Sequence, residues 1–229
     1  MTEPKKIVLL GATGSIGENT LQVVRKHPDR LQLVGISAHS NAEKLTQIAT
    51  EFNVPHAYLP EAAGRAENFP SATKLDRSAD GLLSLASLDN ADLVVIAVVG
   101  ASGLSPTLAA LQAGKNIVLA NKESLVLGGD LVMQTAKENQ VKVLPADSEH
   151  NAIFQCIQGE SQRDIDSIIL TASGGPFREL PIEELQHVTI EQALDHPNWS
   201  MGNKVTIDSA TMANKGLELI EARWLFDIP

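Results

Sequence analysis

The sequence predicts an α/β protein in which a doubly wound parallel sheet is followed by a smaller α+β unit. In the first 150 residues, short runs of aliphatic and β-branched residues alternate with stretches of helical period. The short runs are apolar at nearly every position, as in parallel strands that helices cover on both faces. After about residue 150 the pattern changes, because Gly, Pro and charged residues separate the remaining apolar segments.

The elements of the first part follow from this alternation. Strands are expected at residues 5–10, 31–37, 92–100, 116–120 and 141–147. Helices are expected at residues 15–27, 41–52, 104–113 and 123–138. The polar stretch within 60–80 is expected to be an irregular excursion. Together these segments form a predicted cofactor-binding domain at residues 1–150.

The second unit is expected at residues 151–229. Strands are predicted at 167–173 (SIILTAS) and 204–210 (KVTIDSA), with a long acidic helix between them, from PIEELQ through EQALD. The last segment, TMANKGLELIEARWLF, has apolar residues at Leu217, Ile220 and Leu225 with charges between them, which predicts an amphipathic helix.

Composition excludes several classes of function. The formal charge is −10 and the basic residues are scattered, which argues against a nucleic-acid partner. No apolar run reaches the roughly 18 residues of a membrane span. The single Cys156 excludes an intramolecular disulfide and a multi-thiolate zinc site, and its apolar setting AIFQCI predicts burial. Residues 1–6 lack the apolar core of a secretory signal, so a bacterial cytoplasm or a plastid stroma is expected.

A glycine-rich turn follows the first predicted strand. Gly11, Gly14 and Gly17 are spaced by three in GATGSIG, and a helix is expected directly afterwards. Glycine lets a backbone approach a pyrophosphate, whose charge the helix N-terminus then meets. Ile16 stands where a P-loop needs its second glycine, so a P-loop is excluded. A glycine turn in some other βα unit is the alternative to a Rossmann-type dinucleotide site. The cofactor contacts expected in this turn are Gly11, Thr13, Gly14, Ser15, Ile16 and Gly17.

The end of the second predicted strand distinguishes NAD from NADP. An acidic residue there would bind the ribose 2′-hydroxyl and repel a 2′-phosphate. This strand ends in Ser37-Ala38-His39-Ser40-Asn41 and has no acid. His39, Ser40 and Asn41 can donate hydrogen bonds to a phosphate, although no Arg or Lys among them supplies a fixed charge. The sequence therefore favours NADPH, and a polar loop that touches nothing is the alternative.

Two carboxylates, Asp147 and Glu149, follow the predicted strand at 141–147. They can point into one cavity, and hard oxygen ligands without thiolates suit Mg²⁺ or Mn²⁺. The alternative is a helix N-terminus, in which Asp147 or Ser148 is the cap and Glu149 lies in the first turn. His150 is left without a role, because a packed core histidine is the commoner case.

Several longer motifs resemble one enzyme family. The segments ANKESLV (120–126), LPADSEHNAIFQ (144–155), LTASGGPFRE (170–179), HPNWSMGNK (196–204) and DSATMANKGLELIEARWLF (208–226) are similar to successive signature blocks of 1-deoxy-D-xylulose 5-phosphate reductoisomerases. GATGSIGENTLQVV is similar to the family's N-terminal block. The resemblance implies conversion of 1-deoxy-D-xylulose 5-phosphate to 2-C-methyl-D-erythritol 4-phosphate, with NADPH and a divalent metal ion.

The resemblance also implies roles for individual residues. The implied metal ligands are Asp147, Glu149 and Glu218. The implied contacts to the reacting part of the substrate are Lys122, Ser148 and Glu149, with Lys122, Asp147, Glu149 and Glu218 as the catalytic set. The implied phosphate contacts are Ser173, Ser209, Asn214 and Lys215. A lid is implied at residues 196–202, with His196 near the phosphate, Trp199 over the carbon chain and Met201 near the nicotinamide. Further cofactor contacts are implied at Asn121, Glu123 and Gly202.

The resemblance implies a homodimer and a helical C-terminal domain beyond Phe226, so the second unit is expected to be incomplete. Many family members carry a basic residue where this chain has His39 and Ser40, which bears on the strength of NADP selectivity. Two alternatives stay open. One is another Rossmann oxidoreductase of the homoserine or semialdehyde dehydrogenase type. The other is a fragment that binds NADPH and metal without turnover.

Overall fold

The structure, a computed structural model, describes residues 3–161 and 164–228. The chain forms two compact units, Met1–Asp147 and Ser148–Pro229. Helix α6 (Ser148–Cys156) therefore lies wholly in the second unit, whereas the sequence placed the boundary inside it, after residue 150. No helix among the described residues is both long and apolar enough to cross a membrane.

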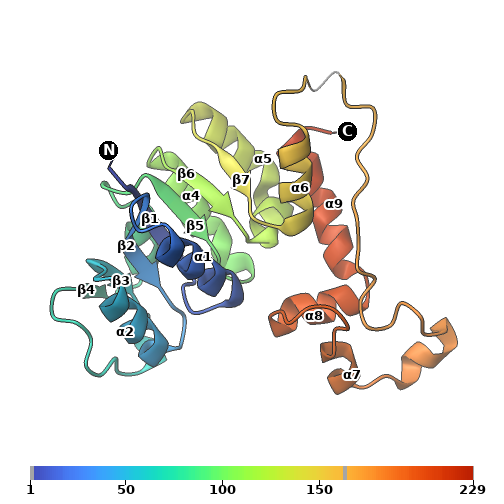
Figure 1. Ribbon diagram of the computed structural model, residues 1–229, viewed down its shortest axis with the longest axis horizontal. Coiled ribbons are helices and arrows are strands. Elements are labelled where there is room, and N and C mark those ends of the chain that lie inside the picture. Colours follow the sequence, from blue (N-terminus) through green and yellow to red (C-terminus); the bar gives the residue numbers. More distant parts are fainter. Residues whose placement is uncertain (1–2, 162–163, 229) are drawn as a thin grey trace. The chain divides into compact units, whose positions relative to one another are not determined.

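The first unit is built on a parallel sheet (Figure 1). In the described residues the sheet has seven strands in the order β4-β3-β2-β1-β5-β6-β7, and every neighbouring pair is parallel. The strands are β1 (Lys5–Leu10), β2 (Leu31–Ser37), β3 (His56–Tyr58), β4 (Lys74–Asp76), β5 (Leu93–Ile96), β6 (Asn116–Leu119) and β7 (Val143–Pro145). This confirms the predicted doubly wound α/β fold.

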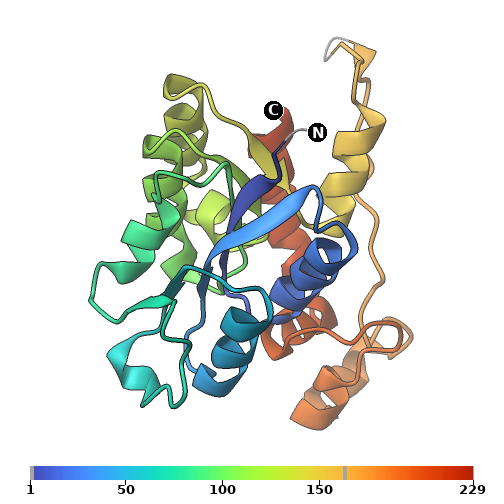
Figure 2. The ribbon, with the colours of Figure 1, turned by 60° about the vertical axis from the view of Figure 1, so that its left-hand side comes forward.

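Helices cover both faces of this sheet (Figures 1 and 2). Helices α1 (Ser15–Lys26) and α2 (Ala42–Glu51) lie on one face. Helices α3 (Gly81–Ala86), α4 (Leu104–Gln112) and α5 (Lys122–Glu138) lie on the other. Strands β2, β3 and β4 lie on one side of β1, whereas β5, β6 and β7 lie on the other, so the strand order reverses between β1 and β5. Ligands of such sheets bind at this reversal, beside the carboxyl ends of the strands.

The core of the first unit is centred on β1. Val8, Leu9 and Leu10 are completely buried, because β1 has a strand on each side and helices on both faces. Its neighbours contribute buried residues such as Ile36 of β2 and Ile96 of β5. Near-continuous apolar runs thus behave as predicted for a parallel sheet.

The edge strand β4 and its neighbour β3 were not predicted. They have three residues each and lie around the stretch that the sequence assigned to an irregular excursion. Part of that stretch is held by Arg77, whose guanidinium donates to the carbonyl oxygens of Pro60, Glu61 and Gly64. Three-residue strands give too few alternating positions for a sequence pattern to detect.

The second unit is helical in its described residues. It contains α6, η4 (Ile182–His187), α7 (Ile190–Leu194), α8 (Asn203–Ala210) and α9 (Ala213–Phe226). Both predicted strands are wrong. Residues 167–173 form no strand, and Ile169 is 83% exposed. Residues 204–210 lie in α8, where Thr206 is buried and its hydroxyl donates to Gly202 O, and where Lys204 and Asp208 pair one turn apart.

Two further expectations for the second unit are corrected. The long acidic helix is split into η4 and α7, because Thr189 begins α7 with a reciprocal capping box to Gln192. Cys156 is exposed rather than buried, since it lies in the last turn of α6.

Helix α9 forms as predicted but buries a different face. Its buried residues are Glu218, Glu221, Ala222 and Phe226, while Ile220 is 40% exposed. Two carboxylates therefore lie on the buried face of this helix. Carboxylates are rarely buried unless they are paired or bind a metal.

Candidate functional site

The glycine turn after β1 has the backbone geometry that the sequence predicts. Gly11 has φ +85°, and a Cβ atom there would lie 2.4 Å from the carbonyl oxygen of Ala97. A Cβ on Gly17 would lie 2.4 Å from Gly11 O, so α1 can pack against the turn only with glycine at this position. The amide of Gly11 donates to the Ser37 hydroxyl at 3.0 Å. The ends of β1, β2 and β5 therefore meet at this turn, and its exposed residues are Gly14, Ser15 and Ile16.

The end of β2 is polar and exposed, as expected. His39 and Ser40 are exposed, and Asn41 is the N-cap of α2, where its Oδ1 accepts from the amide of Lys44 at 3.0 Å. The side chain of Lys44 was missed by the sequence reasoning. Its ammonium lies 3.2 Å from Thr13 O and 2.7 Å from Oε1 of Glu18. The signal was a basic residue three positions after a helix cap.

Asn121 is a structural hub in the first unit. Its side chain is 1% exposed, donates to the carbonyl oxygens of Val98 and Gly100, and accepts from Ser124 at the start of α5. Its amide also lies 3.1 Å from Glu123 Oε2. The Asn121 side chain thus fixes the loop after β5, and a cofactor contact would have to use other atoms of this residue.

The first implied metal ligand, Asp147, is held by a lysine. The ammonium of Lys122, at the N-terminus of α5, donates to the Asp147 carboxylate, and both side chains are largely buried. Lys122 thereby connects two residues that the resemblance placed in the catalytic set. Asp147 is followed by Ser148, where α6 begins.

The other two implied ligands, Glu149 and Glu218, share one cation in the second unit. The ammonium of Lys215 lies 3.0 Å from Glu149 Oε1, and it also donates to Glu218, which is 1% exposed. It further donates to Thr171 O at 2.5 Å. Asn214 donates to the second carboxylate oxygen of Glu218. The predicted grouping of Asn214, Lys215 and Glu218 on one face of α9 is present.

These contacts shift the pKa values of Glu149 and Lys215 in opposite directions. Burial raises the pKa of Glu149, but hydrogen bonds from Ser148 and Lys215 outweigh burial and hold this pKa below its usual value. Burial lowers the pKa of Lys215, but the Glu218 and Glu149 carboxylates raise this pKa by more than burial lowers it. The pKa of Lys215 is therefore above its usual value. Both groups are charged at neutral pH.

All four implied phosphate contacts line a small pocket beside this cluster. The pocket has a volume of about 30 Å³ and is lined by Glu149, Ala172, Ser173, Gly174, Ser209, Met212, Asn214 and Lys215. The ammonium of Lys215 also lies between the two carboxylates. Gly175 allows the 172–175 loop to approach α8, because a Cβ there would lie 2.2 Å from Ser209 O. The glycine pair in TASGGP was a signal for this close approach.

The implied lid begins at a buried histidine. His196 is 8% exposed, and its Nδ1 accepts from the amides of Asn198 and Trp199 at 3.1 Å each. Nδ1 is therefore unprotonated, so Nε2 carries the proton of the neutral ring and donates to the Ser173 hydroxyl at 3.0 Å. The hydroxyl proton of Ser173 stays available for another acceptor. Trp199 is 63% exposed, and Gly202 caps α8 through its carbonyl oxygen.

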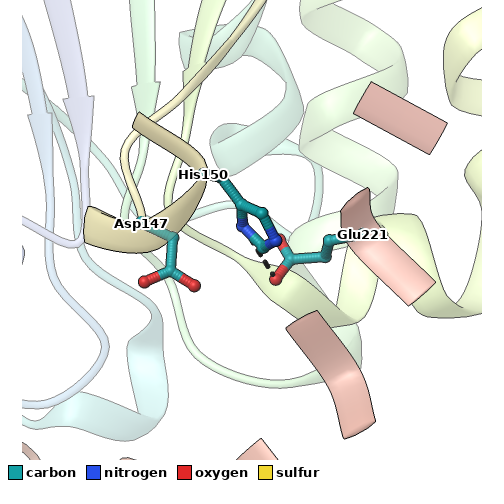
Figure 3. Close-up of side chains that lie close together, drawn as sticks. All are labelled: Asp147, His150 and Glu221. Carbon is teal, nitrogen blue, oxygen red and sulfur yellow. Dashed lines mark ion pairs between the residues drawn. The ribbon is translucent and has the colours of Figure 1, made fainter. Parts of the chain in front are cut away.

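His150, to which the sequence gave no role, is completely buried. One ring nitrogen, Nε2, lies 2.8 Å from the carbonyl oxygen of Glu218, and the other, Nδ1, lies 3.6 Å from Glu221 Oε2. Figure 3 shows His150 and Glu221 pointing toward one another from α6 and α9. The contact of His150 Nε2 with the carbonyl oxygen of Glu218 fixes the backbone of α9 at Glu218, whose carboxylate is buried.

The fold and these side chains define a class of protein. The first unit is a Rossmann-type α/β unit with a glycine turn at the sheet's reversal point, and the second carries carboxylates held by a lysine beside a hydroxyl-lined pocket.

Two family models cover nearly the whole chain. One, described as 1-deoxy-D-xylulose 5-phosphate reductoisomerase, matches residues 7–129. The other, described as the C-terminal domain of the same enzyme, matches residues 143–226.

Curated relatives agree with the family models. A 1-deoxy-D-xylulose 5-phosphate reductoisomerase of Geobacter metallireducens is 51% identical over 230 residues, which cover 98% of this chain and 60% of the relative. The reductoisomerase of Bacillus cereus is 52% identical over 227 residues, with the same coverage of each chain. The chain belongs to the 1-deoxy-D-xylulose 5-phosphate reductoisomerase family. It spans 60% of the length of these curated relatives.

Solved structures of the family have the same fold. A crystal structure of DOX-P reductoisomerase in complex with NADPH, fosmidomycin and magnesium has a TM-score of 0.89 and 44% identity, covering 98% of this chain and 59% of that one. The Zymomonas mobilis enzyme in complex with NADPH has a TM-score of 0.87 and 42% identity, covering 99% of this chain and 59% of that one. The alternative dehydrogenase classes are therefore not the family of this chain.

Proposed function

We propose that this chain carries the cofactor, metal and substrate groups of an enzyme that converts 1-deoxy-D-xylulose 5-phosphate to 2-C-methyl-D-erythritol 4-phosphate. NADPH is the proposed reductant, and Mg²⁺ or Mn²⁺ is the proposed metal. The observation that carries the proposal is the placement of Lys215 between Glu149 and Glu218, beside a pocket lined by hydroxyl and amide groups. The curated relatives bear the name of this activity.

The proposed metal ligands are Asp147, Glu149 and Glu218. Each of these carboxylates is held by an ammonium group, Asp147 by Lys122 and the two glutamates by Lys215. An ammonium between carboxylates stands in for a hard cation, and three carboxylate oxygens suit Mg²⁺ or Mn²⁺. The donor set therefore fits the metal that the related structures contain. When bound, such an ion polarises a carbonyl and stabilises negative charge on the substrate oxygens.

The phosphate is proposed to bind Ser173, Ser209, Asn214 and Lys215. The pocket is too small for a phosphate while Lys215 points between the carboxylates. A metal ion on Glu149 and Glu218 would free the Lys215 ammonium, which could then turn toward the phosphate. Lys215 would thus neutralise the carboxylates before binding and the phosphate dianion afterwards. This exchange keeps a buried charge paired in both states.

The remaining residues are proposed to position the reacting groups. His196 holds Ser173 so that its hydroxyl proton can point to a phosphate oxygen. Residues 196–202 are the proposed lid, with Trp199 as its exposed aromatic residue, and closure would exclude water from the reactive intermediate. Lys122 would be able to donate a hydrogen bond to a substrate hydroxyl once its carboxylate partner Asp147 holds the metal.

NADPH is proposed to bind the first unit at the glycine turn and at His39, Ser40 and Asn41. The absence of an acid at the end of β2 supports NADPH over NADH. Replacing Ser40 by Asp is expected to shift the preference toward NADH. The family implies a homodimer and a bacterial cytoplasmic or plastid location, which we propose for the protein in which this chain acts.

The test is oxidation of NADPH, followed at the nicotinamide absorbance, with 1-deoxy-D-xylulose 5-phosphate and Mg²⁺ or Mn²⁺. Turnover should require the substrate and the metal, and the product should be 2-C-methyl-D-erythritol 4-phosphate by mass spectrometry. Binding of NADPH, metal and substrate without turnover would instead support the alternative of a binding fragment. If the protein bound neither NADPH, nor metal, nor substrate, the proposal would be contradicted.

A further inference from the structure

One cation lies at the junction of the glycine turn with the first two helices. Lys44, in the first turn of α2, places its ammonium 3.2 Å from the carbonyl oxygen of Thr13 and 2.7 Å from Oε1 of Glu18. Glu18 lies in the first turn of α1. The Lys44 and Glu18 side chains are each 34% exposed, so solvent and a ligand can both reach the pair.

Two helix N-termini meet this junction, whose charged side chains are Lys44, Glu18 and Glu43. Helices α1 and α2 begin after β1 and β2, which are neighbours in the sheet, so two helix N-termini lie at the same edge. Each N-terminus favours an anion. Within the two segments 11–18 and 37–44, Lys44 is the only lysine or arginine. It therefore supplies the fixed charge that His39, Ser40 and Asn41 lack.

The end of the second strand is where this fold meets the 2′ position of the adenosine ribose. A 2′-phosphate adds about two negative charges at this position, whereas NADH has a neutral hydroxyl there. Lys44 can neutralise a phosphate only when its ammonium leaves the Glu18 carboxylate. Oδ1 of Asn41 is occupied by the amide of Lys44, which leaves the Asn41 side-chain N–H groups as the donors to such an anion.

We propose that Lys44 determines the preference for NADPH over NADH, and that Glu18 limits this preference by competing with the 2′-phosphate for the Lys44 ammonium. This inference rests on the proposed NADPH site. It assigns the choice between NADPH and NADH to the ion pair of Lys44 with Glu18, which lies outside the end of β2. In the free protein, the Glu18 carboxylate pairs with the Lys44 ammonium and holds it at the junction. Binding of the phosphate exchanges one anionic partner of Lys44 for another.

The experiment measures binding rather than turnover. Isothermal titration with NADPH, NADH, adenosine 2′,5′-bisphosphate and AMP separates the 2′-phosphate contribution from the rest of the cofactor. The variants are Lys44→Met and Glu18→Gln. Arg25→Gln and Glu51→Gln are matched controls, because Arg25 and Glu51 form the ion pair between the opposite ends of the same two helices.

Lys44→Met should weaken binding of NADPH and of the bisphosphate by about tenfold, because a charge-assisted contact is lost, while NADH and AMP change less than about twofold. Glu18→Gln should strengthen binding of the two 2′-phosphate ligands by about threefold, with less effect at high salt. The controls should change neither preference.

Equal weakening of NADPH and NADH in Lys44→Met would show that Lys44 only holds the turn, and would overturn the proposal. An unchanged NADPH affinity in Glu18→Gln would overturn the competing role of Glu18. If the unsubstituted protein binds the bisphosphate but shows no turnover, the proposed reaction is wrong and the selectivity assignment stands. If it binds neither NADPH nor the bisphosphate, both are wrong.

Discussion

The ammonium of Lys215 in α9 lies 3.0 Å from the Oε1 atom of Glu149 in α6, although the two residues are 66 positions apart in the chain. The same ammonium donates to Glu218, which is almost completely buried. One lysine therefore connects two helices of the second unit and keeps two carboxylates close together without net repulsion.

Removing the charge of Lys215 should destabilise the protein in the absence of metal. Lys215→Met leaves the buried Glu218 carboxylate without its cation, and breaking a buried ion pair costs about 3 kcal/mol. Chemical denaturation followed by circular dichroism measures this loss. Lys204→Met is the matched control, because it breaks an exposed pair in α8 with a value of only about 0.5 kcal/mol. Millimolar Mg²⁺ should restore more stability in Lys215→Met than in the unsubstituted protein. Equal losses in the two variants would contradict a buried, charge-dependent role for Lys215.

Glu218→Gln should weaken metal binding while leaving NADPH binding intact. Loss of one carboxylate from the proposed set lowers its charge and should reduce Mn²⁺ affinity by at least about tenfold. Mn²⁺ affinity is measured by electron paramagnetic resonance, and NADPH affinity by nicotinamide fluorescence. Glu184→Gln, an exposed carboxylate in η4, is the control and should affect neither. A loss of NADPH affinity as large as the loss of Mn²⁺ affinity would argue against separate sites.

The first unit could be predicted from the sequence to a large extent because its signals are local. An apolar run, a glycine turn directly after it and a helical pattern directly after the turn are all visible in the residues 5–27, and the structure gives Gly11 of this turn a φ of +85°. Strands β3 and β4 escaped detection, since three residues carry no clear period. Lys44 was missed because the sequence reasoning stopped at the end of the second strand, whereas a long side chain reaches back from the first helical turn.

The second unit shows the limits of local preference. Residues 204–210 contain the β-branched residues Val205, Thr206 and Ile207, which favour a strand, but they form α8, in which Lys204 and Asp208 make an ion pair one turn apart and the Thr206 hydroxyl donates to Gly202 O. The grouping of Lys215 with Glu218 could be predicted, since they are three residues apart on one helix. The approach of Glu149 could not be predicted from spacing. It came only from the family resemblance, because no local rule connects α6 with α9.

Gly11→Ala should disrupt the glycine turn after β1 far more than Gly114→Ala disrupts the backbone around residue 114. Both glycines have positive φ, at +85° and +70°, so each substitution introduces backbone strain of about 1–2 kcal/mol. Gly114 has no atom within 4 Å of an added Cβ, whereas at Gly11 the Cβ would lie 2.4 Å from a backbone oxygen that cannot move freely. Thermal unfolding and NADPH titration should show a small effect for Gly114→Ala and a loss of both stability and binding for Gly11→Ala. Similar effects in the two variants would mean that the close approach at Gly11 is unimportant.

The ion pair between Arg25 and Glu51 should make a pH-dependent contribution to stability. Hydrogen bonding from the Arg25 guanidinium lowers the pKa of Glu51 in the folded state. A lowered folded pKa stabilises the protein above the unfolded pKa of about 4.3, and this contribution is lost as pH falls through the folded value. The free-energy difference between the unsubstituted protein and Glu51→Gln should be below about 1 kcal/mol at pH 7, because both side chains are exposed, and should vanish toward pH 2. A difference that persists or grows in acid would contradict this sign.

The two nitrogens of His196 should have separable functions, one in the backbone of the lid and one in phosphate binding. Nδ1 accepts from the amides of Asn198 and Trp199, and Nε2 donates to Ser173. An Asn side chain can replace the Nδ1 acceptor but does not reach Ser173, whereas a Gln side chain can replace the Nε2 donor and loses the acceptor. His196→Asn should therefore weaken binding of a phosphonate substrate analogue by about tenfold, the effect of one hydrogen bond in a charged site, with the Trp199 emission of the free protein unchanged. His196→Gln should bind the analogue nearly normally but show a more mobile Trp199 by fluorescence anisotropy. Both measurements use a Trp224→Phe background, so that Trp199 is the only indole observed. If both substitutions weaken binding equally and leave the anisotropy unchanged, the assigned tautomer and the division of roles between the two nitrogens are wrong.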